Sequence, residues 1–133
     1  MKITILCVGK IKEKFYRDAI EEYAKRLTRY CKLEIIEVAD EKTPDGASAT
    51  EEMQIRQKEG ERVLARLEKC RQSSSYVMAL AIDGRELDSV ELSQKLEKLG
   101  TDGISHVIFL IGGSLGMSKE PVSYTHLTLP TIL

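Results

Sequence analysis

The chain has 133 residues and a formal net charge of −1, with 42% hydrophobic and 31% charged residues. This length suits one compact domain that buries its own core without disulfide or metal support, and the composition is that of an ordinary soluble globular protein. The near-neutral charge argues against a protein that holds nucleic acid by bulk electrostatic attraction.

The first third of the chain predicts a strand, a helix and a second strand. Residues 2–8 (KITILCV) have apolar side chains on both faces, which predicts a strand covered on both sides. A helix is expected over residues 12–30, because apolar residues recur there every three or four positions with charges between them. Its apolar positions are Phe15, Ala19, Tyr23, Leu27 and Tyr30. Residues 32–39 (KLEIIEVA) predict the second strand.

The remainder continues the alternation. After a polar loop over residues 40–48, Ser48 and Glu51 have capping-box spacing and predict a helix to about Cys70. The buried face of this helix is expected at Met53, Val63, Leu64 and Leu67. A third strand over 76–82 is expected to end at Asp83-Gly84. Asp88 opens a helix to residue 99, and a fourth strand over 105–111 leads into IGGSLG.

This order predicts an α/β fold with a mostly parallel sheet and flanking helices in one domain. In such sheets ligands bind at the carboxyl ends of the strands. Charge is unevenly distributed along the chain: residues 10–32 have eight Lys/Arg and four acids, and residues 34–60 have eight acids and three bases. Such a distribution permits a basic RNA-facing patch, although helices often have these charges only to stay solvated.

Three segments are candidates for a binding site. In IGGSLG, residues 111–116, the glycines would let backbone N–H groups approach a ligand closely, although on spacing alone an ordinary tight turn is the commoner explanation. The end of the third strand in LAIDGREL could face the same crevice, or could be a plain strand-to-helix loop. Lys10, Lys12 and Lys14 follow the first strand, where a solvated charge run is the commoner explanation.

The sequence offers no metal site and no catalytic triad. Cys7, Cys31 and Cys70 form no CxxC pair or Cys/His cluster. Cys7 lies in an apolar run and is expected to be a small buried hydrophobe rather than a reactive thiol. His106 alternates within an apolar strand and is expected to be a satisfied interior histidine. From spacing alone, the prediction stops at a cytoplasmic α/β ligand-binding domain.

Several ordered blocks resemble a known family. MKITILCVGKIKEKFYRDAIEEYAKRLTRYCKLEIIEVADEK, KEGERVLARL, LAIDGRELDSVELSQKL and HVIFLIGGSLG are similar to the ribosomal large-subunit pseudouridine methyltransferase H family of the SPOUT class, over about residues 1–120. The resemblance implies a homodimeric enzyme that uses S-adenosylmethionine and methylates N3 of a pseudouridine in large-subunit (23S) ribosomal RNA on the assembled ribosome. By position, it implies cofactor contacts at Leu80 and Gly112, with Gly113 and Ser114 in the same loop. It assigns no catalytic base.

The last segment departs from the family. SPOUT domains end in a C-terminal segment that forms a trefoil knot, whereas residues 121–133 read PVSYTHLTLPTIL, which looks like an in-frame translation of a sequencing adaptor. We therefore expect a domain over 1–120 without its complete knot, and a non-native or poorly ordered tail over 121–133.

Two other functions stay open. One is a non-enzymatic α/β module that binds a nucleotide or RNA, and the other is a dimerisation domain in which IGGSLG is only a turn. Preference for S-adenosylmethionine over ATP would separate the enzyme from both. With no long apolar segment and no signal-peptide pattern, the protein is expected in the cytoplasm rather than in a membrane.

Overall fold

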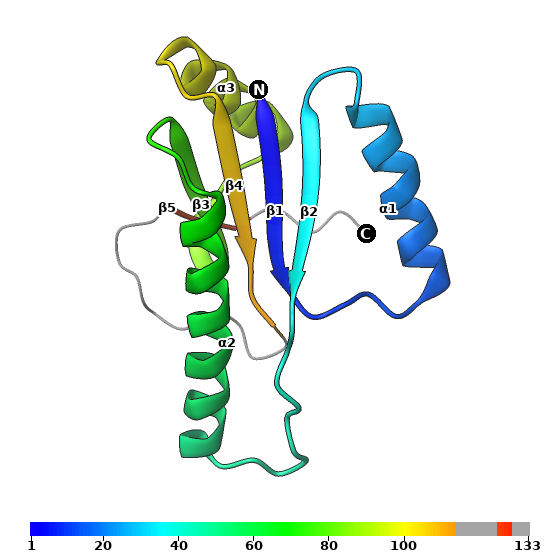
Figure 1. Ribbon diagram of the computed structural model, residues 1–133, viewed down its shortest axis with the longest axis vertical. Coiled ribbons are helices and arrows are strands. Elements are labelled where there is room, and N and C mark those ends of the chain that lie inside the picture. The colour runs from blue at the N-terminus through cyan, green and yellow to red at the C-terminus, as the bar shows by residue number, and fades with distance from the viewer. Residues whose placement is uncertain (114–124, 129–133) are drawn as a thin grey trace.

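The computed structural model describes residues 1–113 and 125–128, with side chains described for residues 1–80 and 84–113. Strands and helices alternate along the chain, as the sequence predicts (Figure 1). The elements are β1 (Lys2–Val8), α1 (Lys14–Leu27), β2 (Lys32–Val38), α2 (Ala49–Cys70), β3 (Ser75–Glu86), α3 (Ser89–Thr101), β4 (His106–Ile111) and β5 (Thr125–Thr128).

The strands form one sheet in the order β2-β1-β4-β3-β5, and all four pairings are parallel. The predicted α/β fold with a parallel sheet is therefore confirmed. The register joins Cys7 of β1 to Ile111 of β4, and Leu80 of β3 to the same Ile111. The ends of β1 and β4 consequently lie next to each other, beside Leu80 of β3.

Alternation of side chains along the strands divides the core into two clusters on opposite faces of the sheet. One cluster packs beneath α2, and it consists of Leu6, Ile36, Val63, Leu67, Val77, Ala79, Ile108 and Leu110. The other packs beneath α3, and its buried members are Met78, Leu87, Leu99 and Val107. Burial of these apolar side chains on both faces is the main stabilising contribution to the fold.

Helix α1 lies alongside β2 at the edge of the sheet (Figure 1) and has no buried residue. The predicted helix is present, but its apolar positions Phe15, Tyr23 and Tyr30 are 65%, 64% and 77% exposed. The half-buried positions are instead Ile20 and Ala24, which are one helical turn apart. The apolar stripe of α1 therefore faces outward.

Strand β1 is also covered less evenly than expected. Thr4 and Leu6 are fully buried on the α2 side, whereas Ile3 and Ile5 on the other side are only half-buried. Ile35, the register partner of Ile5 in β2, is 42% exposed. The face of β1 and β2 opposite α2 thus keeps apolar surface exposed.

The two helix starts that capping residues predict, at Ser48 and Asp88, are confirmed. The Ser48 hydroxyl accepts a hydrogen bond of 3.2 Å from Glu51 N, and the Asp88 carboxylate accepts one of 2.8 Å from Glu91 N. These bonds satisfy backbone donors that a helix leaves unpaired in its first turn. The expected burial of Met53 is wrong, because its side chain is 63% exposed on α2, whereas Val63 and Leu67 are buried as expected.

The end of the third strand also differs from the prediction. Asp83-Gly84 does not end β3, which continues to Glu86. The pairing of β3 with β5 shifts register between Leu80 and Arg85, so the Asp83-Gly84 pair marks an irregularity inside the strand rather than a turn after it. Glycine within a strand often has this role.

The expectations for the last segment concern residues that lie mostly outside the described part. Of residues 121–133, only 125–128 are described, and they form β5, which the sequence analysis did not predict. The domain boundary at residue 120 and the non-native tail stay predictions. Among the described residues, no helix is long and apolar enough to cross a membrane.

Candidate functional site

The candidate site lies at the edge of the sheet where β1 and β4 end side by side. From β1 the chain continues to β2 on one side of this pair, whereas β5, which follows β4 in the order of described elements, lies on the other side beyond β3. Two neighbouring strands whose connections lead in opposite directions create a crevice outside their carboxyl ends, which is the usual ligand site of open α/β sheets. The segments that follow are Gly9 after β1 and Gly112-Gly113 after β4.

Leu80 and the glycine segment are brought together at this edge, as the sequence predicts. Leu80 pairs in register with Ile111, the residue before Gly112. The Leu80 side chain is half-buried and packs against the cluster beneath α3. Gly112 and Gly113 are each half-buried, and Ser114 lies outside the described residues. The last residue of β3 that pairs with β4, the apolar Leu80, therefore lies beside bare backbone at the end of β4.

The loops after β1 and β2 form the next part of the rim. Gly9 has a φ of +86°, a conformation that side chains other than hydrogen disfavour, and its N–H donates to the carbonyl of Val38 over 2.8 Å. This bond joins the ends of β1 and β2. Lys10, Lys12 and Lys14, the third candidate segment, follow Gly9 and are all exposed to solvent.

A carboxylate from α2 lies close to the glycine segment and was not among the residues predicted from the sequence. Glu59 is only 4% exposed, and its Oε2 accepts a hydrogen bond of 3.0 Å from Glu41 N. A Cβ on Gly113 would lie 2.8 Å from Glu59 Oε1. A sequence signal did exist, because Glu59 has i, i+4, i+8 spacing with Val63 and Leu67, the two buried apolar residues of α2. Acidic residues are seldom buried unless they are paired, so a carboxylate in this apolar stripe indicates that Glu59 has a polar interaction to make.

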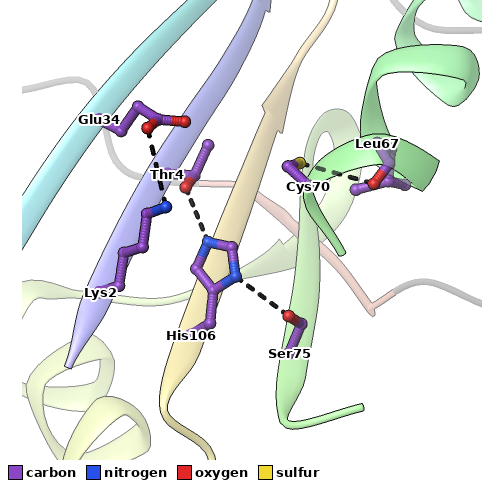
Figure 2. Close-up of polar contacts among 7 residues, drawn as sticks. All are labelled: Lys2, Thr4, Glu34, Leu67, Cys70, Ser75 and His106. Carbon is purple, nitrogen blue, oxygen red and sulfur yellow. Dashed lines mark hydrogen bonds and ion pairs between the residues drawn. The ribbon is translucent and has the colours of Figure 1, made fainter. Parts of the chain in front are cut away.

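His106 lies at the opposite, amino end of the strands and bonds to structural hydroxyls (Figure 2). Its Nε2 is 2.7 Å from Thr4 Oγ1, and its Nδ1 is 3.0 Å from Ser75 Oγ. Burial, and then the charge of Lys2, lower the pKa of the imidazole. Both ring nitrogens have partners in a buried site, which confirms the expected interior histidine.

Cys7 is half-buried, with its Sγ 3.6 Å from the carbonyl oxygen of Ile36. Burial, and then the charge of Glu37, raise the pKa of its thiol. A raised pKa lowers the fraction of reactive thiolate at neutral pH, which agrees with the expectation of an inert thiol.

A cavity of about 780 Å³ also lies at the amino end of the strands, away from the glycine segment. Its lining is Met1, Lys2, Thr28, Arg29, Tyr30, Cys31, Lys32, Gly100, Gly103, Ile104 and Ser105. Ligands of parallel sheets bind at the other end of the strands, so this cavity is not the candidate site.

Comparison with known proteins decides the family. A family model described as "Predicted SPOUT methyltransferase" matches residues 1–130 of the chain. The chain belongs to the SPOUT methyltransferase family. The SPOUT family is one of transferase enzymes, so family membership distinguishes this chain from a plain dimerisation domain.

Curated relatives of this SPOUT chain have one shared name, "Ribosomal RNA large subunit methyltransferase H". The protein of Bifidobacterium animalis subsp. lactis is 47% identical over 98% of this chain and 84% of its own length. That of Clostridium tetani is 50% identical over 97% of this chain and 79% of its own length. That of Bifidobacterium adolescentis is 55% identical over 88% of this chain and 71% of its own length. The resemblance stated from the sequence blocks is thereby confirmed.

Proposed function

We propose that this SPOUT chain is a large-subunit ribosomal RNA methyltransferase that uses S-adenosylmethionine and methylates N3 of a pseudouridine in 23S ribosomal RNA. The names of the relatives support the reaction and the RNA. One structural observation carries the position of the cofactor: Leu80 lies in register with Ile111, directly beside Gly112-Gly113, at the carboxyl edge of the sheet. We propose Leu80, Gly112, Gly113 and Ser114 as its binding residues.

The described residues suit such a cofactor. An adenine ring has apolar faces and a polar edge, and this edge of the sheet offers an apolar side chain, Leu80, beside glycine backbone with free approach to N–H and C=O groups. The cofactor supplies an electrophilic methyl group on a sulfonium. The protein residues bind and orient, since alignment of nucleophile, methyl and sulfur accounts for much of the rate of such a displacement.

The RNA would approach the same edge. Lys10, Lys12 and Lys14 follow β1 there, and their exposed side chains are available to phosphates. A chain with a net charge of −1 gains little from bulk attraction. We therefore propose that local charge and the shape of the assembled ribosome select the substrate, and that the reaction takes place in the cytoplasm.

We further propose that the enzyme is a homodimer. The support is apolar surface left exposed on α1, on β2 and at the end of β4. Its members are Phe15, Tyr16, Tyr23, Leu27, Tyr30, Ile35 and Ile111. Four of these seven residues are aromatic, and aromatic residues are enriched in protein interfaces.

The experiment is a calorimetric titration of the chain with S-adenosylmethionine, S-adenosylhomocysteine and ATP, followed by transfer of a labelled methyl group to isolated ribosomes. We expect binding of the first two ligands, no binding of ATP, and label at N3 of a pseudouridine. Binding of ATP with equal affinity, or no binding of S-adenosylmethionine either by the folded chain or by a version with a family-type C-terminal segment, would contradict the enzyme. Those outcomes would favour a non-enzymatic α/β module that binds nucleotides or RNA.

A further inference from the structure

Glu59 is a buried carboxylate whose hydrogen bonding is incomplete. Its side chain lies in the apolar stripe of α2 with Val63 and Leu67, and the residue is 4% exposed. Its Oε2 accepts a hydrogen bond from Glu41 N over 3.0 Å. Its Oε1 is fully buried and has no hydrogen-bond partner among the described residues. Proteins seldom leave a buried acceptor unsatisfied, and such an atom calls for an explanation.

Arg62 does not supply the missing partner. Arg62, one helical turn further along α2, donates to the carbonyl of Ala39 over 3.0 Å and pairs with Glu41. The ion pairs found in the described part of the chain do not include Glu59. Arg62 instead stabilises the loop whose N–H bonds to Glu59 Oε2. The carboxylate is therefore held in place at one oxygen, and the other oxygen is left available.

The available oxygen faces the glycine segment. A Cβ built on Gly113 would lie 2.8 Å from Glu59 Oε1, 3.1 Å from Oε2 and 3.2 Å from Cδ. Gly113 is not among the glycines with positive φ, so its backbone conformation would accept alanine. The reason for glycine at this position is consequently the carboxylate, which occupies the space that a side chain would need.

We propose that Glu59 is a positioning residue of the cofactor site, which acts through the glycine segment. Its carboxylate packs against Gly113 and fixes the path of the backbone after β4. Its Oε1 accepts a hydrogen bond from a backbone N–H of Gly112-Gly113 when the cofactor is bound. This role rests on the proposed function, because it assumes that the segment binds S-adenosylmethionine.

The first test is Glu59→Gln, which keeps the shape but has only one acceptor oxygen. In either orientation of the amide, its NH₂ group faces another hydrogen-bond donor and cannot accept from it. That donor is either Glu41 N or the group that donates to Oε1 when the cofactor is bound. Without ligand, only the Glu41 bond is needed, so the melting temperature should be unchanged or higher. Affinity for S-adenosylhomocysteine should fall about tenfold or more, as for a lost hydrogen bond to a charged group. Glu61→Gln, two residues along the same helix and exposed, is the matched control.

The second test is a double-mutant cycle of Gly113→Ala and Glu59→Ala. Alone, Gly113→Ala places a methyl group against the carboxylate and should weaken cofactor binding about tenfold, whereas after Glu59→Ala the same change should cost less than about twofold. An equal effect in both backgrounds would overturn the proposal. So would a Glu59→Gln variant that melts earlier and binds as tightly as the parent, since that result describes a purely structural residue. Failure of the parent chain to bind S-adenosylhomocysteine would instead count against the proposed function.

Discussion

The imidazole of His106 and the hydroxyl of Thr4 form a buried hydrogen bond of 2.7 Å that links β4 to β1 (Figure 2). Thr4 is fully buried and His106 is 3% exposed. Ser75 of β3 bonds to the other ring nitrogen, so one side chain connects three neighbouring strands. The link lies at the end of the sheet opposite the glycine segment, where it holds the register on which the candidate site depends.

Replacing Thr4 with valine should destabilise the fold. Valine has nearly the same shape but no hydroxyl, so His106 Nε2 would be left buried without a partner. We expect the free energy of unfolding in urea to fall by about 1–3 kcal/mol, the usual cost of such a group. Thr50→Val, at an exposed position in the first turn of α2, should change it by less than about 0.5 kcal/mol. An equal loss in both variants would contradict the role of the buried bond.

Stability should depend on pH through His106. Burial and the charge of Lys2 lower the pKa of this imidazole in the folded state. The unfolded chain therefore binds a proton more readily than the folded chain, and protonation below the unfolded value of about 6.5 favours unfolding. The free energy of unfolding should decrease as the pH falls from about 7.5 to about 5.5, and the decrease should be smaller in His106→Gln. Identical slopes in the two proteins would assign the pH dependence to other groups.

The regular elements could be predicted from the sequence because their signals are local. Ser48 and Asp88 cap helices through bonds to residues three positions ahead, and such bonds need no tertiary context. The α2 face at Val63 and Leu67 also follows from the helical period. The position of Gly112-Gly113 could also be predicted, because they directly follow an apolar strand in a parallel sheet.

Other features depend on tertiary structure and were missed. The period of α1 reveals an apolar stripe at Phe15 and Tyr23 but not what covers it, and within the described chain both side chains are exposed. Asp83-Gly84 is typical of a turn, yet β3 continues past it and pairs with β5 at Arg85 and Glu86. Glu59 contacts Gly113 across 54 positions of sequence, which no local pattern reveals.

The aromatic surface of α1 should control self-association. Phe15 and Tyr23 are 65% and 64% exposed, so replacing both with serine removes apolar surface without opening the core. We expect sedimentation to show a dimer for the parent and a shift toward monomer for the double variant, with unchanged circular dichroism. Serine at the charged positions Glu21 and Arg17 of the same helix is the control. A parent that is monomeric at all concentrations would contradict the proposed homodimer.

Cys7 should resist alkylation in the native protein. Its thiol pKa is raised by burial and by Glu37, so little of the nucleophilic thiolate is present near neutral pH. Mass spectrometry after treatment with iodoacetamide should show Cys7 modified much more slowly in the folded chain than in urea. Glu37→Gln removes the smaller of the two causes and should change the rate only slightly. Native labelling as fast as in urea would show that the end of β1 is open to solvent.

Leu80 should contribute to cofactor affinity through apolar contact. The side chain is half-buried within β3, and its register partner Ile111 precedes the glycine segment. Loss of its apolar contact in Leu80→Ala should weaken binding of S-adenosylhomocysteine by about 1–2 kcal/mol, or about five- to thirtyfold. Leu80→Met, which preserves volume, should retain most of the affinity.

Leu96→Ala separates this effect from general destabilisation. Leu96 is half-buried in the same cluster but lies on α3, so its truncation should lower the melting temperature without changing the dissociation constant. Titrations must be made well below the melting temperature of each variant, because unfolding would otherwise mimic weak binding. If Leu80→Ala and Leu96→Ala lost affinity equally, Leu80 would be a core residue only, and the adenine would have to bind elsewhere along the carboxyl edge of the sheet.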